Sequence, residues 1–194
     1  GGLRRHEFIR GGMRSAARLT YEQVDAARNG NPDDTTEPLV DAVIAPLYGA
    51  FETLQAARVR RSAIDLDLPE RQVKLDRNGS VTGIEPVARL DSHRLIEEFM
   101  ISANVAAAET LERKNAPCIF RIHDRPSPEK MEGLREALSS IGINLSKGQV
   151  VTPKLFQRIL TQVANKPEAH MAHMAVHRSQ ARAEYNPSNI GHFG

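Results

Sequence analysis

Apolar side chains recur with a helical period over most of the chain. From about residue 36 to residue 60 they lie three or four positions apart, which predicts a helix that Pro46 should kink or split. The longest such stretch covers residues 91–114, capped by Asp91 or Ser92, and its many alanines allow close packing, so we expect a central helix. Shorter helices are predicted over residues 20–29, 128–141, 153–164 and 167–183.

Alternating apolar and polar residues predict a smaller amount of strand. Residues 3–10 and the AIDLDL stretch at 63–68 follow a period of two. Residues 72–75 and 81–84 flank the sequence Asp76-Arg77-Asn78-Gly79, which favours a hairpin turn. Residues 118–122 (CIFRI) are expected to form a short buried strand. This order of elements predicts an α+β fold, rich in helix, with a small mixed or antiparallel sheet.

The composition favours a soluble globular protein. Of the 194 residues, 40% are hydrophobic and 26% are charged. No apolar run approaches the ~20 residues of a membrane span, so we expect no association with a membrane. Cys118 is the one cysteine and cannot form an internal disulfide. Since the first residues also lack the apolar core of a signal peptide, we expect a reducing, cytoplasmic location.

Positive charge is concentrated in two places, although the net charge is only +2. Residues 1–18 contain five arginines and one acid, and Arg58, Arg60 and Arg61 form a second cluster. Such clusters can meet phosphates, but they are more often solvated surface. The chain begins with Gly1 rather than methionine and stops after a His-Phe-Gly stretch, so we expect it to be a segment of a longer protein.

Two groups of side chains have the chemistry of metal ligands. His170, His173 and His177 would lie along one stripe of a helix, but apart from Glu168 at the helix start no acid or cysteine completes a zinc set, so an exposed, histidine-rich helix is the simpler interpretation. Asp65 and Asp67 would point to the same face of the predicted strand. They could hold Mg²⁺, or they could form the solvent face of an edge strand. We therefore predict no metal site in this chain.

Glu97 and Tyr21 are the candidates for binding a ligand. Glu97 lies in the first turns of the long predicted helix, on a face that is otherwise largely uncharged. Its carboxylate needs a partner, either Arg94 or another basic side chain, or a hydroxyl group of a ligand. Tyr21 lies in a first helical turn, where a phenol can brace the helix start or stack on a base. The residues alone leave both alternatives open.

Four stretches of the sequence are informative when taken together. They are residues 14–24 (RSAARLTYEQV), 91–105 (DSHRLIEEFMISANV), 117–127 (PCIFRIHDRPS) and 185–194 (EYNPSNIGHFG). In order and spacing they resemble the middle of the RNB catalytic domain of the ribonuclease II family of exoribonucleases, and the RIHDRPSP sequence is closer to the ribonuclease R branch. The resemblance implies that residues 1–194 are a single partial RNB domain that lacks both flanks of that domain.

The resemblance implies a function for the longer protein. Family members remove nucleotides one at a time from the 3′ end of single-stranded RNA and use Mg²⁺ held by aspartates that precede this region. An arginine motif that contacts the scissile phosphate normally follows it. The implied activity is thus a 3′→5′ processive exoribonuclease that releases nucleoside monophosphates, with no catalytic residue and no metal ligand in this segment. We expect the isolated segment to be inactive and able to self-associate, and the longer enzyme to be monomeric.

Two matching positions belong to the substrate site of the family. Tyr21 corresponds to a tyrosine that contacts the terminal nucleotide, and Glu97 to a glutamate near the ribose. A carboxylate only accepts hydrogen bonds, so Glu97 can take one from the 2′-hydroxyl that DNA lacks. The alternative is a helical module without catalytic activity that binds RNA or a protein partner.

Overall fold

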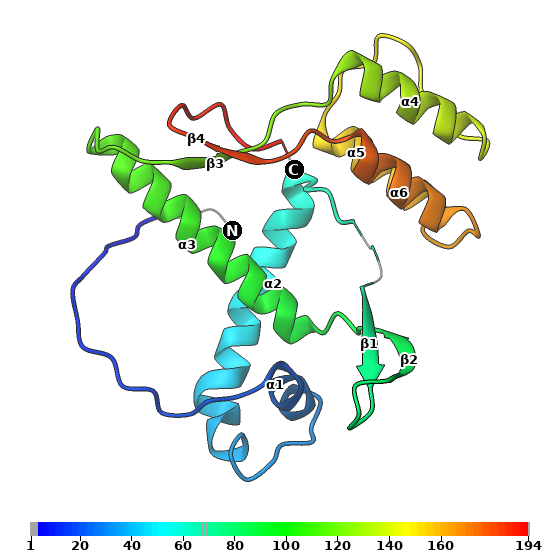
Figure 1. The fold of residues 1–194 in the computed structure, drawn as a ribbon. Helices are drawn as coiled ribbons and strands as arrows, with labels where there is room; N and C mark the ends of the chain where they lie inside the picture. The colour runs from blue at the N-terminus through cyan, green and yellow to red at the C-terminus, as the bar shows by residue number, and fades with distance from the viewer. Residues whose placement is uncertain (1–3, 67, 69, 194) are drawn as a thin grey trace. The chain divides into compact units, whose positions relative to one another are not determined.

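The computed structural model describes residues 4–66, 68 and 70–193. They form two compact units, each drawn in Figure 1. The first unit combines Gly1–Arg58 with Glu85–Ala116, and the second combines Val59–Ile84 with Pro117–Gly194. Each unit therefore joins segments that are distant in the sequence.

The first unit is helical. It contains α1 (Tyr21–Arg28), a 3₁₀ turn η1 (Glu37–Leu39), a π-helical turn η2 (Val40–Ile44), most of α2 (Ala45–Arg61) and α3 (Asp91–Arg113). Pro46 is the second residue of α2, and the helix is split just before it, as predicted, because proline has no N–H to continue the hydrogen-bond ladder. The hydrophobic core of this unit is formed by side chains from α1, η2, α2 and α3: Ala27, Ile44, Tyr48, Phe51 and Leu95.

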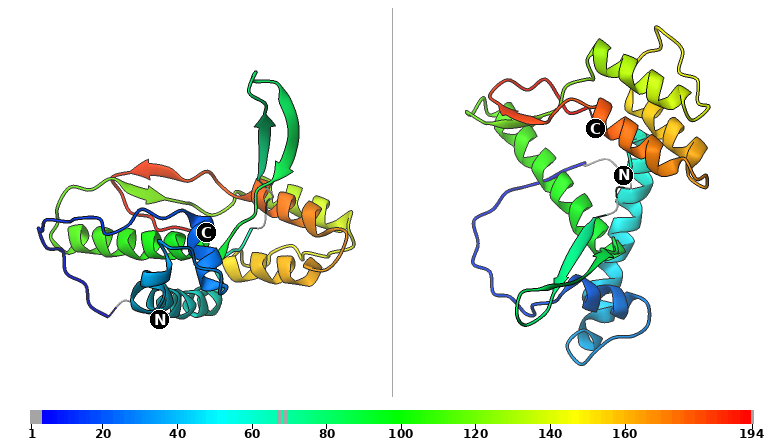
Figure 2. Two further views of the ribbon diagram at one scale, coloured as in Figure 1. Left: turned by 90° about the horizontal axis from the view of Figure 1, so that it is seen from below. Right: turned by 45° about the vertical axis from the view of Figure 1, so that its right-hand side comes forward.

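The second unit contains three helices and two small ribbons of strand. The ribbons are the hairpin of β1 (Arg71–Leu75) and β2 (Val81–Pro86), whose last two residues fall in the first unit, and the antiparallel pair of β3 (Phe120–Ile122) and β4 (Glu184–Asn186). Each pair can be followed in Figure 2. The helices are α4 (Pro128–Ser139), α5 (Pro153–Val163) and α6 (Ala169–Ser179).

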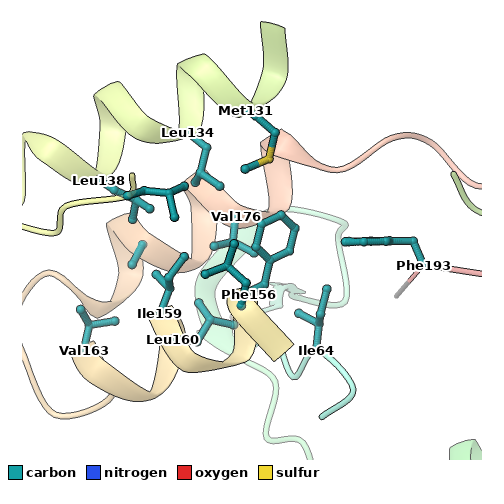
Figure 3. Close-up of a cluster of buried hydrophobic side chains, with 13 residues drawn as sticks. Ile64, Met131, Leu134, Leu138, Phe156, Ile159, Leu160, Val163, Val176 and Phe193 are labelled. Atoms are coloured by element: carbon teal, nitrogen blue, oxygen red, sulfur yellow. The ribbon is translucent and has the colours of Figure 1, made fainter. Parts of the chain in front are cut away.

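The core of the second unit lies between its three helices. Figure 3 shows Met131, Leu134 and Leu138 pointing from α4 toward α5 and α6. Phe156 of α5 and Val176 of α6 are completely buried there. Such burial of large apolar side chains is the main favourable contribution to folding, so this cluster holds the helices of the unit together.

The predicted α+β class, rich in helix with short antiparallel strands, is confirmed. All six predicted helices and the hairpin are present, although several are shorter than expected. The CIFRI strand is also shorter, and only Ile122 of the three β3 residues is buried. None of the described helices is long and apolar enough to cross a lipid bilayer.

Two predicted strands were wrong. Residues 4–10 form no strand; His6 there bonds through Nε2 to the hydroxyl of Thr110, 2.6 Å away on α3. Residues 63–66 and 68 are not a strand either, and the backbone N–H of Asp65 donates to the side chain of Gln157 at 2.9 Å. A strand needs a partner strand, and the described residues provide none for either segment.

The start and the surroundings of α3 also differ from expectation. Leu90, rather than Asp91 or Ser92, is the N-cap residue, and its N–H donates to His93 Nδ1 at 3.2 Å. The helix was expected to be central, but four of its apolar residues are each at least 38% exposed: Ile96, Met100, Ile101 and Val105. Alanine allows close packing without requiring it.

Candidate functional site

Tyr21 is held at the start of α1 by a capping box. The hydroxyl of Thr20 accepts the N–H of Gln23 at 3.2 Å, and the side-chain oxygen of Gln23 accepts the N–H of Thr20 at 2.9 Å. This reciprocal pair satisfies two backbone donors that the first helical turn leaves free. Tyr21 follows the cap directly and keeps 42% of its surface exposed, so its ring is both positioned and accessible.

The ring of Tyr21 stacks on His93, the third residue of α3. The ring centroids are 4.2 Å apart and the planes are inclined by 27°. Beside the stack, the buried hydroxyl of Ser92 donates to the backbone carbonyl of Tyr21 at 2.9 Å. The start of α1 is therefore joined to the start of α3 by one ring contact and one hydrogen bond.

Glu97 lies one turn beyond His93 on the same face of α3, because residues four apart are neighbours on a helix. Its Oε2 accepts a hydrogen bond from the guanidinium of Arg89 at 2.7 Å, and its Oε1 lies 3.9 Å from Nη1 of Arg58. Arg94, the partner considered from the sequence, pairs with Asp91 instead. Each carboxylate oxygen has two lone pairs, so Glu97 retains capacity to accept a further hydrogen bond.

Glu98, the next residue, has a different environment. Its side chain is only 6% exposed, and its Oε1 accepts a hydrogen bond from Arg58 at 2.9 Å. Arg58 thus joins α2 to α3 and also approaches Glu97. Of the two adjacent acids in LIEE, Glu98 is used in packing and Glu97 is the one open to solvent.

His93 and Glu97 therefore lie one turn apart on one face of α3, and the ring of Tyr21 from α1 stacks on His93. Together these residues offer a half-exposed aromatic ring and a carboxylate that can accept a hydrogen bond from a hydroxyl group. Aromatic rings stack on nucleobases of any sequence, and an acceptor near a ribose distinguishes a 2′-hydroxyl from hydrogen. This chemistry suits a nucleotide. His93 was not singled out in the sequence, although its spacing of four from Glu97 places both on one face.

The described residues do not fit a metal ion. In residues 4–66, 68 and 70–193 no group of three or more histidines, cysteines, aspartates and glutamates could hold one. His170, His173 and His177 do lie on α6, where they bring no acid or cysteine with them. Asp67 lies outside the described residues. The part of the chain described here supplies no ligand set for Mg²⁺.

Two stretches of the sequence resemblance meet in the second unit. β3 pairs with β4 over Phe120↔Asn186, Arg121↔Tyr185 and Ile122↔Glu184. Beyond the strands, the N–H of His123 donates to the carbonyl of Gly191 at 3.1 Å. The N–H of Phe193 donates to the carbonyl of His123 at 2.9 Å. These backbone bonds hold FRIHD against GHFG and give both motifs a structural function.

His123 is buried at this junction. Its Nε2–H donates to the carbonyl of Ala181 at 3.0 Å, and its ring meets that of His192 edge-on, with 5.0 Å between centroids. Burial is the largest cause that lowers the pKa of His123; His192 and Arg121 lower it further, while the hydrogen bond to Ala181 and the nearby Asp124 oppose the shift. The net shift favours the neutral imidazole.

Comparisons with known proteins match the whole chain. Residues 1–194 match the family model of the RNB domain. Ribonuclease R of Aquifex aeolicus is 38% identical over 197 residues, covering 100% of this chain and 28% of the relative. Ribonuclease R of Escherichia coli is 36% identical over 196 residues, covering 100% of this chain and 24% of the relative.

Solved structures show the same fold. Mycoplasma genitalium RNase R in complex with ribose-methylated single-stranded RNA matches with a TM-score of 0.81 and 23% identity, over 89% of this chain and 27% of that one. The Dss1 exoribonuclease from Candida glabrata matches with a TM-score of 0.58 and 16% identity, over 88% of this chain and 19% of that one. The chain thus spans about a quarter of the length of the curated relatives it matches.

Proposed function

The chain belongs to the RNB domain family, and from that premise we propose that it is the substrate-positioning part of a 3′→5′ exoribonuclease. The longer enzyme would hydrolyse single-stranded RNA processively to nucleoside monophosphates. The relatives are named ribonuclease R, and one solved relative is described in complex with single-stranded RNA. Both units of the chain would belong to one catalytic domain.

The observation that carries this proposal is the Tyr21 ring of α1 stacked on His93 of α3, one helical turn before Glu97. In the proposed function Tyr21 stacks on the base of the terminal nucleotide, and Glu97 accepts a hydrogen bond from its 2′-hydroxyl. Arg89 holds the Glu97 carboxylate by a 2.7 Å hydrogen bond, which limits the directions in which it can accept another. Positioning the terminal nucleotide in this way brings its phosphodiester bond to a fixed place.

We assign no step of bond cleavage to this chain. Its described residues supply no metal ligand set, and we propose that Mg²⁺, the cofactor expected for the longer enzyme, is held by residues outside the chain. The isolated segment should accordingly leave RNA intact in the presence of Mg²⁺. Release of nucleoside monophosphates by the purified segment would contradict this.

We also propose a cytoplasmic location and a monomeric longer enzyme. The single cysteine, Cys118, fits a reducing compartment. The isolated segment should self-associate through the exposed apolar side of α3, because large apolar patches favour association. Light scattering of the segment should show species above 21.5 kDa.

The test of substrate reading is Glu97→Ala in the full-length protein that contains this segment. We expect the ratio of kcat/KM for RNA to kcat/KM for a DNA strand of the same sequence to fall by about 10-fold or more, because each such hydrogen bond contributes roughly 1.5 kcal/mol. Glu109→Ala is the matched control, since Glu109 is an exposed acid further along α3. The same ratio for the wild type and Glu97→Ala would exclude this function for Glu97.

A protein that binds single-stranded RNA but never shortens it would instead support the non-catalytic module. A 3′-end-labelled strand separates the two outcomes, because an exonuclease releases the label as a mononucleotide at once.

A further inference from the structure

We propose that His93 is a positioning residue that holds the Tyr21 ring with one face open to a nucleobase. The inference rests on the proposed function, in which Tyr21 binds the terminal nucleotide. His93 itself would not touch the RNA; it would act through the phenol ring stacked on it. The observations come entirely from the first unit, where α1 and α3 pack together.

The stacking geometry restricts Tyr21 to one-sided binding. With the centroids 4.2 Å apart and the planes within 27°, the imidazole covers one face of the phenol ring. Tyr21 nevertheless keeps 42% of its surface exposed. A nucleobase would therefore add to a stack that already has two members, and the third ring would meet a phenol that cannot turn freely.

The imidazole is fixed by the start of α3. Leu90 is the N-cap residue, and His93 is at the third position of the helix, so its side chain can reach back to the N-cap backbone. Its Nδ1 accepts the Leu90 N–H at 3.2 Å. A ring nitrogen that accepts a hydrogen bond carries no proton, so the neutral imidazole must carry its proton on Nε2.

A second, independent bond fixes the other member of the stack. Ser92 is buried, and its hydroxyl donates to the carbonyl of Tyr21 at 2.9 Å. The backbone of Tyr21 and the ring of His93 are thus both tied to the same helical turn. His93 also lies four residues before Glu97 on α3, so the same turn sets the position of the aromatic ring relative to the carboxylate.

Two substitutions separate the two interactions that His93 makes. His93→Asn keeps a side-chain oxygen that can accept the Leu90 N–H but removes the ring. His93→Phe keeps a ring that can stack but removes the acceptor. If His93 acts by stacking, His93→Asn in the full-length protein that contains this segment should lower kcat/KM on a short 5′-labelled oligoadenylate by roughly 3- to 10-fold. His93→Phe should restore it to within about 2-fold of the wild type.

A double-mutant cycle shows whether the effect passes through Tyr21. In a Tyr21→Ala background, adding His93→Asn should change kcat/KM by less than about 2-fold, because the ring that His93 supports is gone. A loss from His93→Asn that is equally large with and without Tyr21 would overturn the proposal. So would an equal loss in His93→Phe and His93→Asn, which would mean that only the helix cap matters.

The two proposals fail differently. If Tyr21→Ala leaves kcat/KM unchanged, the function assigned to Tyr21 is wrong. If Tyr21→Ala lowers it and His93→Asn does not, only the present inference is wrong. Should His93→Asn not fold, ¹⁵N chemical shifts of the native imidazole give an independent answer: a proton on Nε2 is expected, and a proton on Nδ1 would exclude the geometry on which the proposal rests.

Discussion

Replacing Arg58 with methionine should destabilise the first unit strongly, although Arg58 lies partly at the surface. The Arg58 side chain is 22% exposed, but the Glu98 side chain that it contacts at 2.9 Å is only 6% exposed. Arg58→Met keeps most of the apolar stem of the side chain and removes the charge. The Glu98 carboxylate is then left buried without a counter-charge, which is the costly half of a buried ion pair.

The magnitude follows from the distance and the burial. At 2.9 Å, with an effective dielectric constant of about 20, the Coulomb attraction is about 6 kcal/mol. Water that reaches the partly exposed guanidinium and the vacated site reduces this value. We expect a loss of about 3 kcal/mol, the lower end of the range for breaking a buried pair. Replacing both members, Arg58→Met with Glu98→Met, should recover most of the loss, because no charge then remains buried.

Native-state hydrogen exchange, followed peptide by peptide, measures this effect locally. Protection of the amides of α2 and α3 should fall in Arg58→Met and largely return in the double variant, while α4–α6 of the second unit serve as internal reference. Arg60→Met, at an exposed arginine two residues along α2, is the control and should change stability by less than ~0.5 kcal/mol. A loss under about 1 kcal/mol, or a double variant as unstable as Arg58→Met, would refute this reasoning.

Three further changes test other parts of the structure. Thr20→Ala should lower the free energy of unfolding by about 1 kcal/mol and speed amide hydrogen exchange in α1. Thr20→Ser should behave like the wild type, because serine keeps the capping hydroxyl. Phe156→Ala should cost about 3–5 kcal/mol in urea denaturation followed through α4–α6, since the ring is fully buried. Because burial lowers the pKa of His123, the unfolded chain takes up a proton that the folded one refuses as pH falls below about 6.5. The second unit should therefore be most stable above that pH, and His123→Gln should flatten the loss of stability between about pH 7 and 5.

Local interactions explain which elements could be predicted from the sequence. The Thr20 capping box, Pro46 and the Asp-Arg-Asn-Gly turn each act within a few residues, and each marks the boundary that the structure has. Gly142, expected to end a helix, has a φ of +77°, which glycine adopts at little cost. Boundaries that depend on such local interactions can be predicted from one sequence.

Strand pairing depends on residues far apart, and the predictions failed there. β4 was not predicted, because Glu184–Asn186 becomes a strand only through β3, more than sixty residues earlier. Residues 4–10 alternate suitably, yet no described strand pairs with them. A period of two indicates that a segment can be a strand, and the hydrogen-bond partner decides whether it becomes one.

The candidate site divides in the same way. Tyr21 and Glu97 were candidates from their chemistry, and the family resemblance related them to a substrate site. The spacing of His93 and Glu97 on α3 could be obtained from helical geometry alone. What no local pattern contains is the packing of α1 on α3, which brings the Tyr21 ring to within 4.2 Å of His93. Because of that packing, a histidine that bonds to the N-cap backbone of α3 also stacks on the aromatic ring of Tyr21. Leu90, Ser92 and Glu97 lie on the same stretch of chain as His93. Substitutions at the start of α3 should therefore weaken nucleotide binding while they leave the free energy of unfolding of the second unit unchanged.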